Sequence, residues 1–381
     1  MKDKIRILHI QETIYHGGVE RRKLSLAKLL PKDTYHQHFV CTHALGTIPD
    51  QIRAEGYDIT EIDDVQHPFQ WSQHRKIQNI ISKYKPHIIH GSVFEGMTFA
   101  AIDGSLMRVP IKIMEETSDP VNRSSKASLL LRLMSRFATT VIAVSPQVAQ
   151  YLHEVAKIPS NKIKIIPNGV EVRSAKDSSL PQASIPIPQN AWVIGSVGRM
   201  WDDEHKRFSD LIRAFSEIRS KIPQAHLLLV GDGPVKDQYI ALVKELDLEN
   251  QVYFAGFQED PTYFYNMMNV FALPSAREAF GLVVVEAMLQ NIPVVASEVG
   301  GIPSIIMHQQ TGYLITPKNP DQLAETLLHI HQNPAEAAQV AQSGYEHAFK
   351  NFSAEAYVER VQNLYQQLIK AKIPHLLSKT K

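Results

Sequence analysis

Apolar residues recur along the first half of the chain in short runs that alternate with segments of helical periodicity. The runs IRILHI, HIIH, IKIM and TVIAVS predict buried strands, and helices are predicted over residues 20–30, 97–107 and 129–138. Strands that alternate with helices form parallel sheets covered on both faces. The first half therefore predicts a doubly wound α/β domain.

The same alternation starts again after a segment, residues 174–189, that is rich in Ser and Pro and lacks a strong period. Strands are predicted at AWVIGSVG, HLLLVGDG, QVYFAG, VFALPS and IPVVAS, with helices at 208–220, at 235–246, after Gly281 and after Pro320. The run Val283-Val284-Val285 fits a strand, whereas the following EAML fits a helix, and periodicity leaves both open. This half predicts a second doubly wound domain.

A last helix is predicted over residues 354–370, with an apolar face that must cover another surface. This face carries Tyr357, Val361, Leu364, Tyr365 and Leu368. The expected organisation is a domain over residues 1–172, a linker over 173–190, a domain over 191–352 and a terminal helical segment over 353–381.

Length and composition agree with this organisation and narrow the function classes. A chain of 381 residues exceeds one ordinary core. No run approaches the roughly 20 apolar residues that span a bilayer, and a formal charge of +1 gives no global argument for nucleic-acid binding. The opening MKDKIRILHI shows no secretory signal, and the single Cys41 forms no internal disulfide, so a cytoplasmic location is expected.

One cluster of potential metal ligands surrounds Cys41 in the sequence. His36 and His38 would face the side of a strand opposite Cys41 and His43, so a four-ligand metal site is not predicted. Cys41 is expected to be a core or edge residue.

Gly17-Gly18 follows the first strand and precedes a helix. Glycines let a backbone approach a ligand, and free N–H groups at a helix start favour an anion. The pair matches neither GxGxxG nor a Walker loop, and a tight strand-to-helix turn explains it equally well.

Gly198-Arg199 follows a strand in the second half, with Lys206 seven residues further on. An Arg and a Lys can neutralise a diphosphate that gains charge as its bond to a sugar breaks, although solvated surface charges are the alternative. Asp202-Asp203-Glu204 lies between them, and we expect solvated acids there rather than a metal site.

The segment LPSAREAFGLVVVEAMLQ carries two carboxylates, Glu278 and Glu286, across a loop-to-helix transition, with Phe280-Gly281 between them. Carboxylates accept hydrogen bonds from vicinal hydroxyls, so one can hold a ribose and the other a sugar. Two solvated acids at a helix start are the alternative from these residues alone.

This arrangement resembles the Glu-x7-Glu motif of the retaining family 4 glycosyltransferases of the GT-B fold, also called glycosyl transferases group 1. The resemblance extends through GGVER, VSPQVAQYL, KIIPNGVE, GSVGRM, HLLLVGDGP, VYFAGF, IPVVASEVGGIPSII and TGYLI, in order. It implies two Rossmann-like domains facing a cleft and a terminal helix that packs back on the N-terminal domain.

The resemblance also implies roles. Arg199 and Lys206 would hold the donor diphosphate next to Gly198, Glu286 the ribose and Glu278 the transferred sugar. Phe280 and Gly281 would shape the pocket with backbone N–H groups, and Gly17 and Gly18 would close over the diphosphate. Transfer would retain the anomeric configuration without a metal or other cofactor, and a UDP-sugar donor is favoured over a GDP-sugar.

The acceptor side departs from the family pattern. Many relatives carry a His after the strand that corresponds to IKIM, whereas this chain has Glu115-Glu116, and Glu116 is the expected match. A surface acidic turn is the alternative. His90 and His16 are further candidate acceptor contacts, with a satisfied structural histidine as the alternative for each.

Many relatives act on lipid-linked or lipopolysaccharide acceptors at the inner face of a membrane. Basic and apolar residues that could contact an anionic membrane here are Arg21, Arg22, Lys23, Lys28, Lys126, Leu129, Leu130, Leu131, Arg132, Leu133 and Arg136. A helix buried on the sheet, with its charges reaching solvent, is the alternative.

Three other functions stay open at this point. A nucleotide-sugar epimerase shares the fold, a two-domain sugar-binding protein shares the α/β class, and a degenerate transferase could act as a scaffold. The ordered motifs and the retained Glu278 and Glu286 favour a transferase for a glycan or lipid-linked acceptor.

Overall fold

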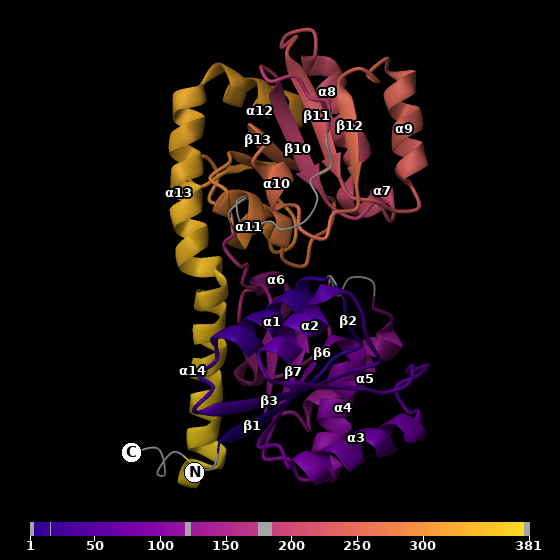
Figure 1. The fold of residues 1–381 in the computed structure, drawn as a ribbon, viewed down its shortest axis with the longest axis vertical. Helices are drawn as coiled ribbons and strands as arrows, with labels where there is room; N and C mark the ends of the chain where they lie inside the picture. The colour runs from indigo at the N-terminus through magenta and orange to yellow at the C-terminus, as the bar shows by residue number, and fades with distance from the viewer. Residues whose placement is uncertain (1–3, 16, 119–122, 174–184, 377–381) are drawn as a thin grey trace. The chain divides into compact units, whose positions relative to one another are not determined.

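The computed structural model describes residues 4–15, 17–118, 123–173 and 185–376 (Figure 1). Contacts divide the chain into two compact units. The first unit contains the chain up to Glu171 together with the segment from Ala354, and the second unit is Val172–Ser353. Most of the segment predicted as a linker, residues 174–184, lies outside the described residues.

The described part of the first unit contains a seven-stranded parallel sheet in the order β5-β3-β1-β6-β7-β8-β9. Its strands are β1 (Ile5–Ile10), β3 (Tyr35–Cys41), β5 (Asp58–Glu61), β6 (Ile88–Ser92), β7 (Ile111–Glu116), β8 (Thr140–Ala143) and β9 (Ile163–Ile165), with the short pair β2 (Thr13–Ile14) and β4 (His43–Ala44) beside it. Its helices are α1 (Gly18–Leu29), α2 (Thr47–Ala54), α3 (Trp71–Tyr84), α4 (Val93–Leu106), α5 (Ser125–Ser135), α6 (Pro146–Glu154) and α14 (Ala354–Lys372).

The period of two along each strand sends alternate side chains to opposite faces of this sheet. Ile5 and Ile7 of β1 pack in one apolar cluster with α1 and α14. Leu8 and Ile10 pack in another cluster with α3 and α4. His9 therefore belongs to the face that α1 and α14 cover.

Helix α14 supplies one of these layers, although it follows the whole second unit in sequence. Tyr357, Val361 and Leu364 are buried in the cluster that also contains Ile7 and Ile113, and α14 lies beside α1 (Figure 1). The apolar face predicted for the last helix thus covers the sheet of the first unit.

The described part of the second unit contains a six-stranded parallel sheet in the order β12-β11-β10-β13-β14-β15. Its strands are β10 (Trp192–Val197), β11 (Ala225–Val230), β12 (Val252–Gly256), β13 (Val270–Leu273), β14 (Val294–Ser297) and β15 (Tyr313–Ile315). Its helices are α7 (Asp203–Lys206), α8 (Phe208–Ile218), α9 (Lys236–Glu245), α10 (Thr262–Tyr265), α11 (Leu282–Leu289), α12 (Pro320–Gln332) and α13 (Pro334–Phe352). The two doubly wound domains predicted from the alternation are confirmed.

Two ambiguous segments take definite structures. The β-branched run Val283–Val285 is helical within α11. Cys41 is buried and free, and the neighbouring His36 and His38 contact Tyr84 and Thr60 rather than a shared metal centre.

In the ranges that the structure describes, no helix is long and apolar enough to cross a bilayer.

Candidate functional site

Two adjacent strands of the second unit end beside the residues predicted to bind a donor. β10 pairs with β13 in the register Ile194↔Val270. Gly198 and Arg199 follow the carboxyl end of β10, and Glu278 lies in the loop that follows β13. In a parallel sheet these ends meet at one edge, which is where α/β folds bind ligands.

Lys206 and Glu278 form an ion pair at this edge. The Lys206 ammonium donates to Glu278 Oε1, and Ser275 Oγ donates to the same oxygen from 3.1 Å. A Cβ on Gly198 would lie 3.3 Å from Lys206 Cε, so the glycine admits the lysine stem. The structure brings Gly198, Lys206 and Glu278 together, with the two charged side chains 20% and 13% exposed.

Arg199 follows Gly198 at the same strand end and is exposed. Among the described residues its side chain has no hydrogen-bond or ion-pair partner. The guanidinium is therefore accessible to an anionic ligand.

Glu286 lies on α11 and is held by a residue of α10. The hydroxyl of Tyr265, a 2% exposed side chain, donates to Glu286 Oε2 from 2.8 Å. Gly281 caps the start of α11 with a φ of 107°, a conformation that favours glycine. Phe280 is buried and packs on Phe352 with ring centroids 5.7 Å apart, so its ring is not available to a ligand.

Two glycines that sequence reasoning did not assign to the site shape its backbone. A Cβ on Gly231 would lie 1.9 Å from Gly198 O, and one on Gly233 would lie 2.3 Å from Met200 O. The loop after β11 therefore packs directly against the loop after β10. The motif HLLLVGDGP, with two glycines after a strand, is the sequence signal for this contact, and Tyr265 and Ser275 had no such signal.

The acids between Arg199 and Lys206 have partners within the protein. Asp202 accepts from His205 N at 2.9 Å and from its ring at 2.6 Å, and the histidine lowers the pKa of this carboxyl. Asp203 accepts from Ser209 and from the Tyr239 hydroxyl. In the part of the chain that is described, no group of three or more His, Cys, Asp or Glu side chains could hold a metal ion.

In the first unit, Gly17 and Gly18 form the start of α1 after β1. A Cβ on Gly17 would lie 2.3 Å from Glu20 Oε2, so the carboxylate folds back over the helix start in the space that glycine leaves. The first N–H groups of a helix lack carbonyl partners within it. His16 lies outside the described residues.

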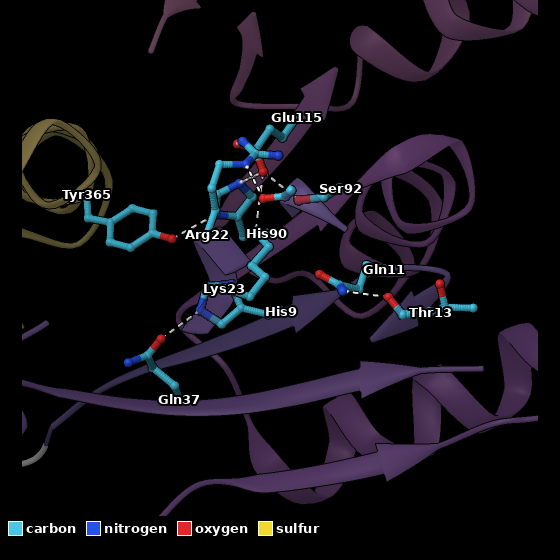
Figure 2. Close-up of polar contacts among 11 residues, drawn as sticks. His9, Gln11, Thr13, Arg22, Lys23, Gln37, His90, Ser92, Glu115 and Tyr365 are labelled. Carbon is cyan, nitrogen blue, oxygen red and sulfur yellow. Dashed lines mark hydrogen bonds and ion pairs between the residues drawn. The ribbon is translucent and has the colours of Figure 1, made fainter. Parts of the chain in front are cut away.

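The two described acceptor candidates are buried. His90 is fully buried, with Nδ1 2.7 Å from the Tyr365 hydroxyl and Nε2 3.3 Å from Glu115 Oε2 (Figure 2). Burial and the nearby Lys23 lower the pKa of His90 to about 4. The prediction that His90 contacts an acceptor therefore does not fit its position, because β-strand alternation turns it toward α14.

Glu116 is also fully buried and is held within its own loop. Its carboxylate accepts from Ser118 Oγ at 2.7 Å and pairs with Arg123 Nη2 at 2.6 Å. The surface acidic turn considered as an alternative is wrong, and an acceptor role for Glu116 requires this pair to open.

Sequence models of two glycosyltransferase families match this chain. "Glycosyltransferase Family 4" matches residues 16–174, and "Glycosyl transferases group 1" matches residues 180–347. The chain belongs to the group 1/family 4 glycosyltransferases.

Curated relatives of this glycosyltransferase are distant. The N-acetyl-alpha-D-glucosaminyl L-malate synthase of Bacillus anthracis is 28% identical over 63% of this chain and 63% of its own length. The UDP-Gal:alpha-D-GlcNAc-diphosphoundecaprenol alpha-1,3-galactosyltransferase of Escherichia coli is 21% identical over 86% of this chain and 88% of its own. The match to the first relative spans less than two thirds of that protein.

Solved structures share the fold. Anabaena HepE in complex with UDP and glucose superposes with a TM-score of 0.81 at 24% identity, covering 94% of this chain and 99% of that one. Sucrose-phosphate synthase from Thermosynechococcus elongatus gives 0.76 at 23% identity, covering 97% and 100%. The glycosyltransferase thus has the GT-B arrangement of two Rossmann-like sheets.

Proposed function

We propose that this glycosyltransferase moves a sugar from a nucleotide-diphosphate sugar to an acceptor hydroxyl, with retention of the anomeric configuration. The observation that carries the proposal is the edge of the second sheet, where Arg199, Lys206 and Glu278 follow adjacent strands. This edge combines two cations for a diphosphate with the Glu278 carboxylate for sugar hydroxyls. Among the similar proteins, HepE binds UDP and the E. coli enzyme is named for UDP-Gal, which supports a UDP-sugar over a GDP-sugar.

The proposed roles follow the chemistry of each side chain. Arg199 and Lys206 bind the diphosphate and stabilise the charge that develops on it as it leaves. Glu286, oriented by Tyr265, binds the ribose, while Glu278 binds hydroxyls of the transferred hexose or N-acetylhexosamine. Because two protein cations supply this stabilisation, we propose that no metal or other cofactor takes part.

The proposed reaction is a front-face displacement. The acceptor oxygen bonds to the anomeric carbon on the face from which the diphosphate departs with its electron pair, and the donor phosphate takes the acceptor proton. Glu278 is then a binding residue, not a nucleophile. Trapping a covalent glycosyl-enzyme at Glu278 would contradict this mechanism.

The acceptor class is proposed from the names of the relatives. They include a transferase that acts on a diphosphoundecaprenol-linked sugar and one for lipopolysaccharide core biosynthesis. We accordingly propose a role in cell-surface polysaccharide, lipopolysaccharide or glycolipid synthesis, in the cytoplasm at the inner face of the cell membrane.

Helix α5 supports peripheral contact with an anionic membrane. Leu129, Leu133 and Phe137 are 55%, 42% and 57% exposed, and Lys126, Arg132 and Arg136 are exposed on the same segment. A face that is both basic and apolar suits an anionic interface.

Of the other basic residues considered for the membrane, Arg22, Lys23 and Lys28 do not fit this role. Arg22 and Lys23 are buried, and Lys28 pairs with Glu171 at 3.0 Å. Co-sedimentation with anionic vesicles at low salt, abolished by Arg132→Glu with Arg136→Glu, tests the α5 surface, and absence of binding by the unchanged protein would remove it.

A panel of nucleotide sugars, screened for thermal stabilisation of the protein, tests the proposed function. A donor that binds the folded chain raises its melting temperature by mass action. We expect the UDP-sugars to give the largest shifts and Glu286→Ala to abolish them. If no nucleotide or nucleotide sugar shifts the melting temperature, the proposal is wrong, and conversion of the donor alone to an epimer would identify an epimerase instead.

A further inference from the structure

A buried charge cluster lies at the carboxyl end of β7 in the first unit (Figure 2). Glu115 Oε1 accepts from Arg22 Nη1 at 2.6 Å. Glu115 Oε2 accepts from Ser92 Oγ at 2.5 Å and from Lys23 Nζ at 3.3 Å. One carboxylate therefore joins α1, β6 and β7.

All of these side chains are removed from water. Glu115, Lys23 and Ser92 are fully buried, and Arg22 is 1% exposed. Two cations share a single carboxylate, while burial keeps the pKa of His90 low and its ring neutral. Apolar residues of similar volume often stabilise a core as well as such a group does, so stability alone is a weak explanation for it.

The contacts of this cluster lead to turns at the ligand-binding edge of the sheet. The Arg22 side chain runs back along α1, with Nε 3.4 Å from Gly18 O. Ser92 immediately precedes Val93, a β-branched residue with a φ of 63° at the start of α4. Such a conformation is strained for valine and persists only where its surroundings hold it.

The cluster is also attached to α14. The Tyr365 hydroxyl lies 2.7 Å from His90 Nδ1, and His90 Nε2 lies 3.3 Å from Glu115. The Arg22 guanidinium lies 5.8 Å from the centre of the Tyr357 ring. Helix α14, which packs on the sheet, thus fixes the side of the cluster that faces away from these turns.

We propose that Glu115 is a positioning residue that holds the turns after β1 and β6, and above all the Gly17–Gly18 start of α1, in the geometry that binds substrate. Arg22 transmits the constraint to α1, and Ser92 transmits it to the start of α4. The consequence for catalysis rests on the proposed function and on the expectation, drawn from the family resemblance, that Gly17 and Gly18 contact the donor diphosphate.

A second buried ion pair in the same unit provides a matched control. His74 Nδ1 lies 2.7 Å from Asp103 Oδ2, and both side chains are fully buried. This pair joins α3 to α4 near the C-terminal end of α4, away from the turns that follow β1 and β6. Removing its charge tests what the loss of any buried ion pair does to the unit.

The experiment compares Glu115→Gln with Asp103→Asn by hydrogen exchange of the full chain without ligand. We expect Glu115→Gln to speed exchange of the Arg21 and Arg22 amides in the first turns of α1 by about tenfold relative to Asp103→Asn. Equal effects of the two variants on these amides, or no effect of Glu115→Gln, would overturn the proposal. If Glu115→Gln does not fold, Ser92→Ala replaces it in the experiment, because this variant keeps every charge. We expect faster exchange in the first turn of α4 of Ser92→Ala, and unchanged exchange there would overturn the proposal.

Kinetics with the donor found in the nucleotide-sugar panel separates the positioning role of Glu115 from the donor contact expected of Gly17–Gly18. Glu115→Gln should raise the donor KM by about tenfold with a smaller change in kcat, while Asp103→Asn leaves KM unchanged. Loosened amides with an unchanged KM would keep the positioning role and contradict the donor contact proposed for Gly17–Gly18.

Discussion

The carboxyl edges of the two sheets carry charged residues in opposite environments. In the first unit, Glu115, Arg22 and Lys23 are buried and paired with one another. In the second unit, Lys206 and Glu278 pair while partly exposed, and Arg199 is exposed. The same strand-end position thus holds a closed charge cluster in one unit and an accessible one in the other.

This difference separates two uses of charge. The Lys206–Glu278 pair is partly exposed and Arg199 is exposed, so these cations can be reached by the anionic ligand proposed for this edge. Buried charges depend strongly on their partners, so those of the first unit fix the geometry of the turns around them.

Replacing Glu115 by Ala should give the largest effect on stability. The change leaves Arg22 and Lys23 buried without a counter-charge, which destabilises by about 3–5 kcal/mol. Hydrogen exchange of the slowest amides of β6 measures this local free energy. A loss below about 1 kcal/mol would mean that the buried Glu115 cluster contributes no more to stability than an exposed ion pair, which contradicts the contrast between the two units.

Replacing Lys206 by Ala should lower activity strongly and change stability little. Loss of a cation on the leaving diphosphate should lower kcat by about 10²–10³-fold, while the unfolding free energy of the second unit changes by less than about 1 kcal/mol. Steady-state kinetics and exchange of the β10 amides measure the two quantities. The matched control is Lys244→Ala on the exposed side of α9, and an equal loss of activity there would contradict the assignment.

The stability of the first unit should depend on pH through His90. Its pKa is about 4 in the folded chain and about 6.5 when unfolded, so only the unfolded chain takes up this proton between these values. The unfolding free energy therefore falls as the pH decreases from about 6.5 toward 4, by about 1.4 kcal/mol per unit for one proton.

Exchange of the β6 amides between about pH 6 and pH 5 measures this slope, and His90→Gln should reduce it. Glu115 adds little to the slope in this window, because Arg22 and Lys23 keep its folded-state pKa well below the usual range and its unfolded carboxyl takes up protons mainly below about pH 5. An undiminished slope in the variant would mean that other groups take up the protons.

The smallest predicted effect concerns Tyr265, which orients Glu286 through one hydrogen bond. Tyr265→Phe removes this bond, worth about 1 kcal/mol, and should raise the donor KM about fivefold. Tyr313→Phe is the control, because the buried Tyr313 hydroxyl has no hydrogen-bond partner among the described residues. Equal changes in KM for both variants would remove the role of Tyr265.

Strand and helix alternation in the sequence predicted both sheets through four strands of the first and five of the second, because buried parallel strands need continuous apolar runs. It did not predict the strands β3, β5, β9 and β15, or helices such as α3 and α13. Helix α3 is largely polar and buries only a narrow stripe that includes Ile77 and Ile81. The sequence left the Val283–Val285 run undecided between strand and helix, because the run is helical only as part of the helix that begins after the Gly281 cap.

The site was predictable in part. Glu278 and Lys206 meet because their strands are neighbours, which the α/β pattern implies. The burial of His90 was not predictable, because its partner Tyr365 lies 275 positions away in sequence. Arg22 and Lys23 have the polarity of a helix surface, and only Glu115, brought from β7, makes their burial tolerable.

Calorimetric titration of the protein with UDP, without acceptor, tests whether the second unit binds the donor nucleotide through Glu286. We expect saturable 1:1 binding to the unchanged chain and loss of that binding in Glu286→Ala, with binding retained in the surface variant Lys244→Ala. Equal affinity of the unchanged chain and Glu286→Ala for UDP, or no binding of any nucleoside diphosphate, would contradict it.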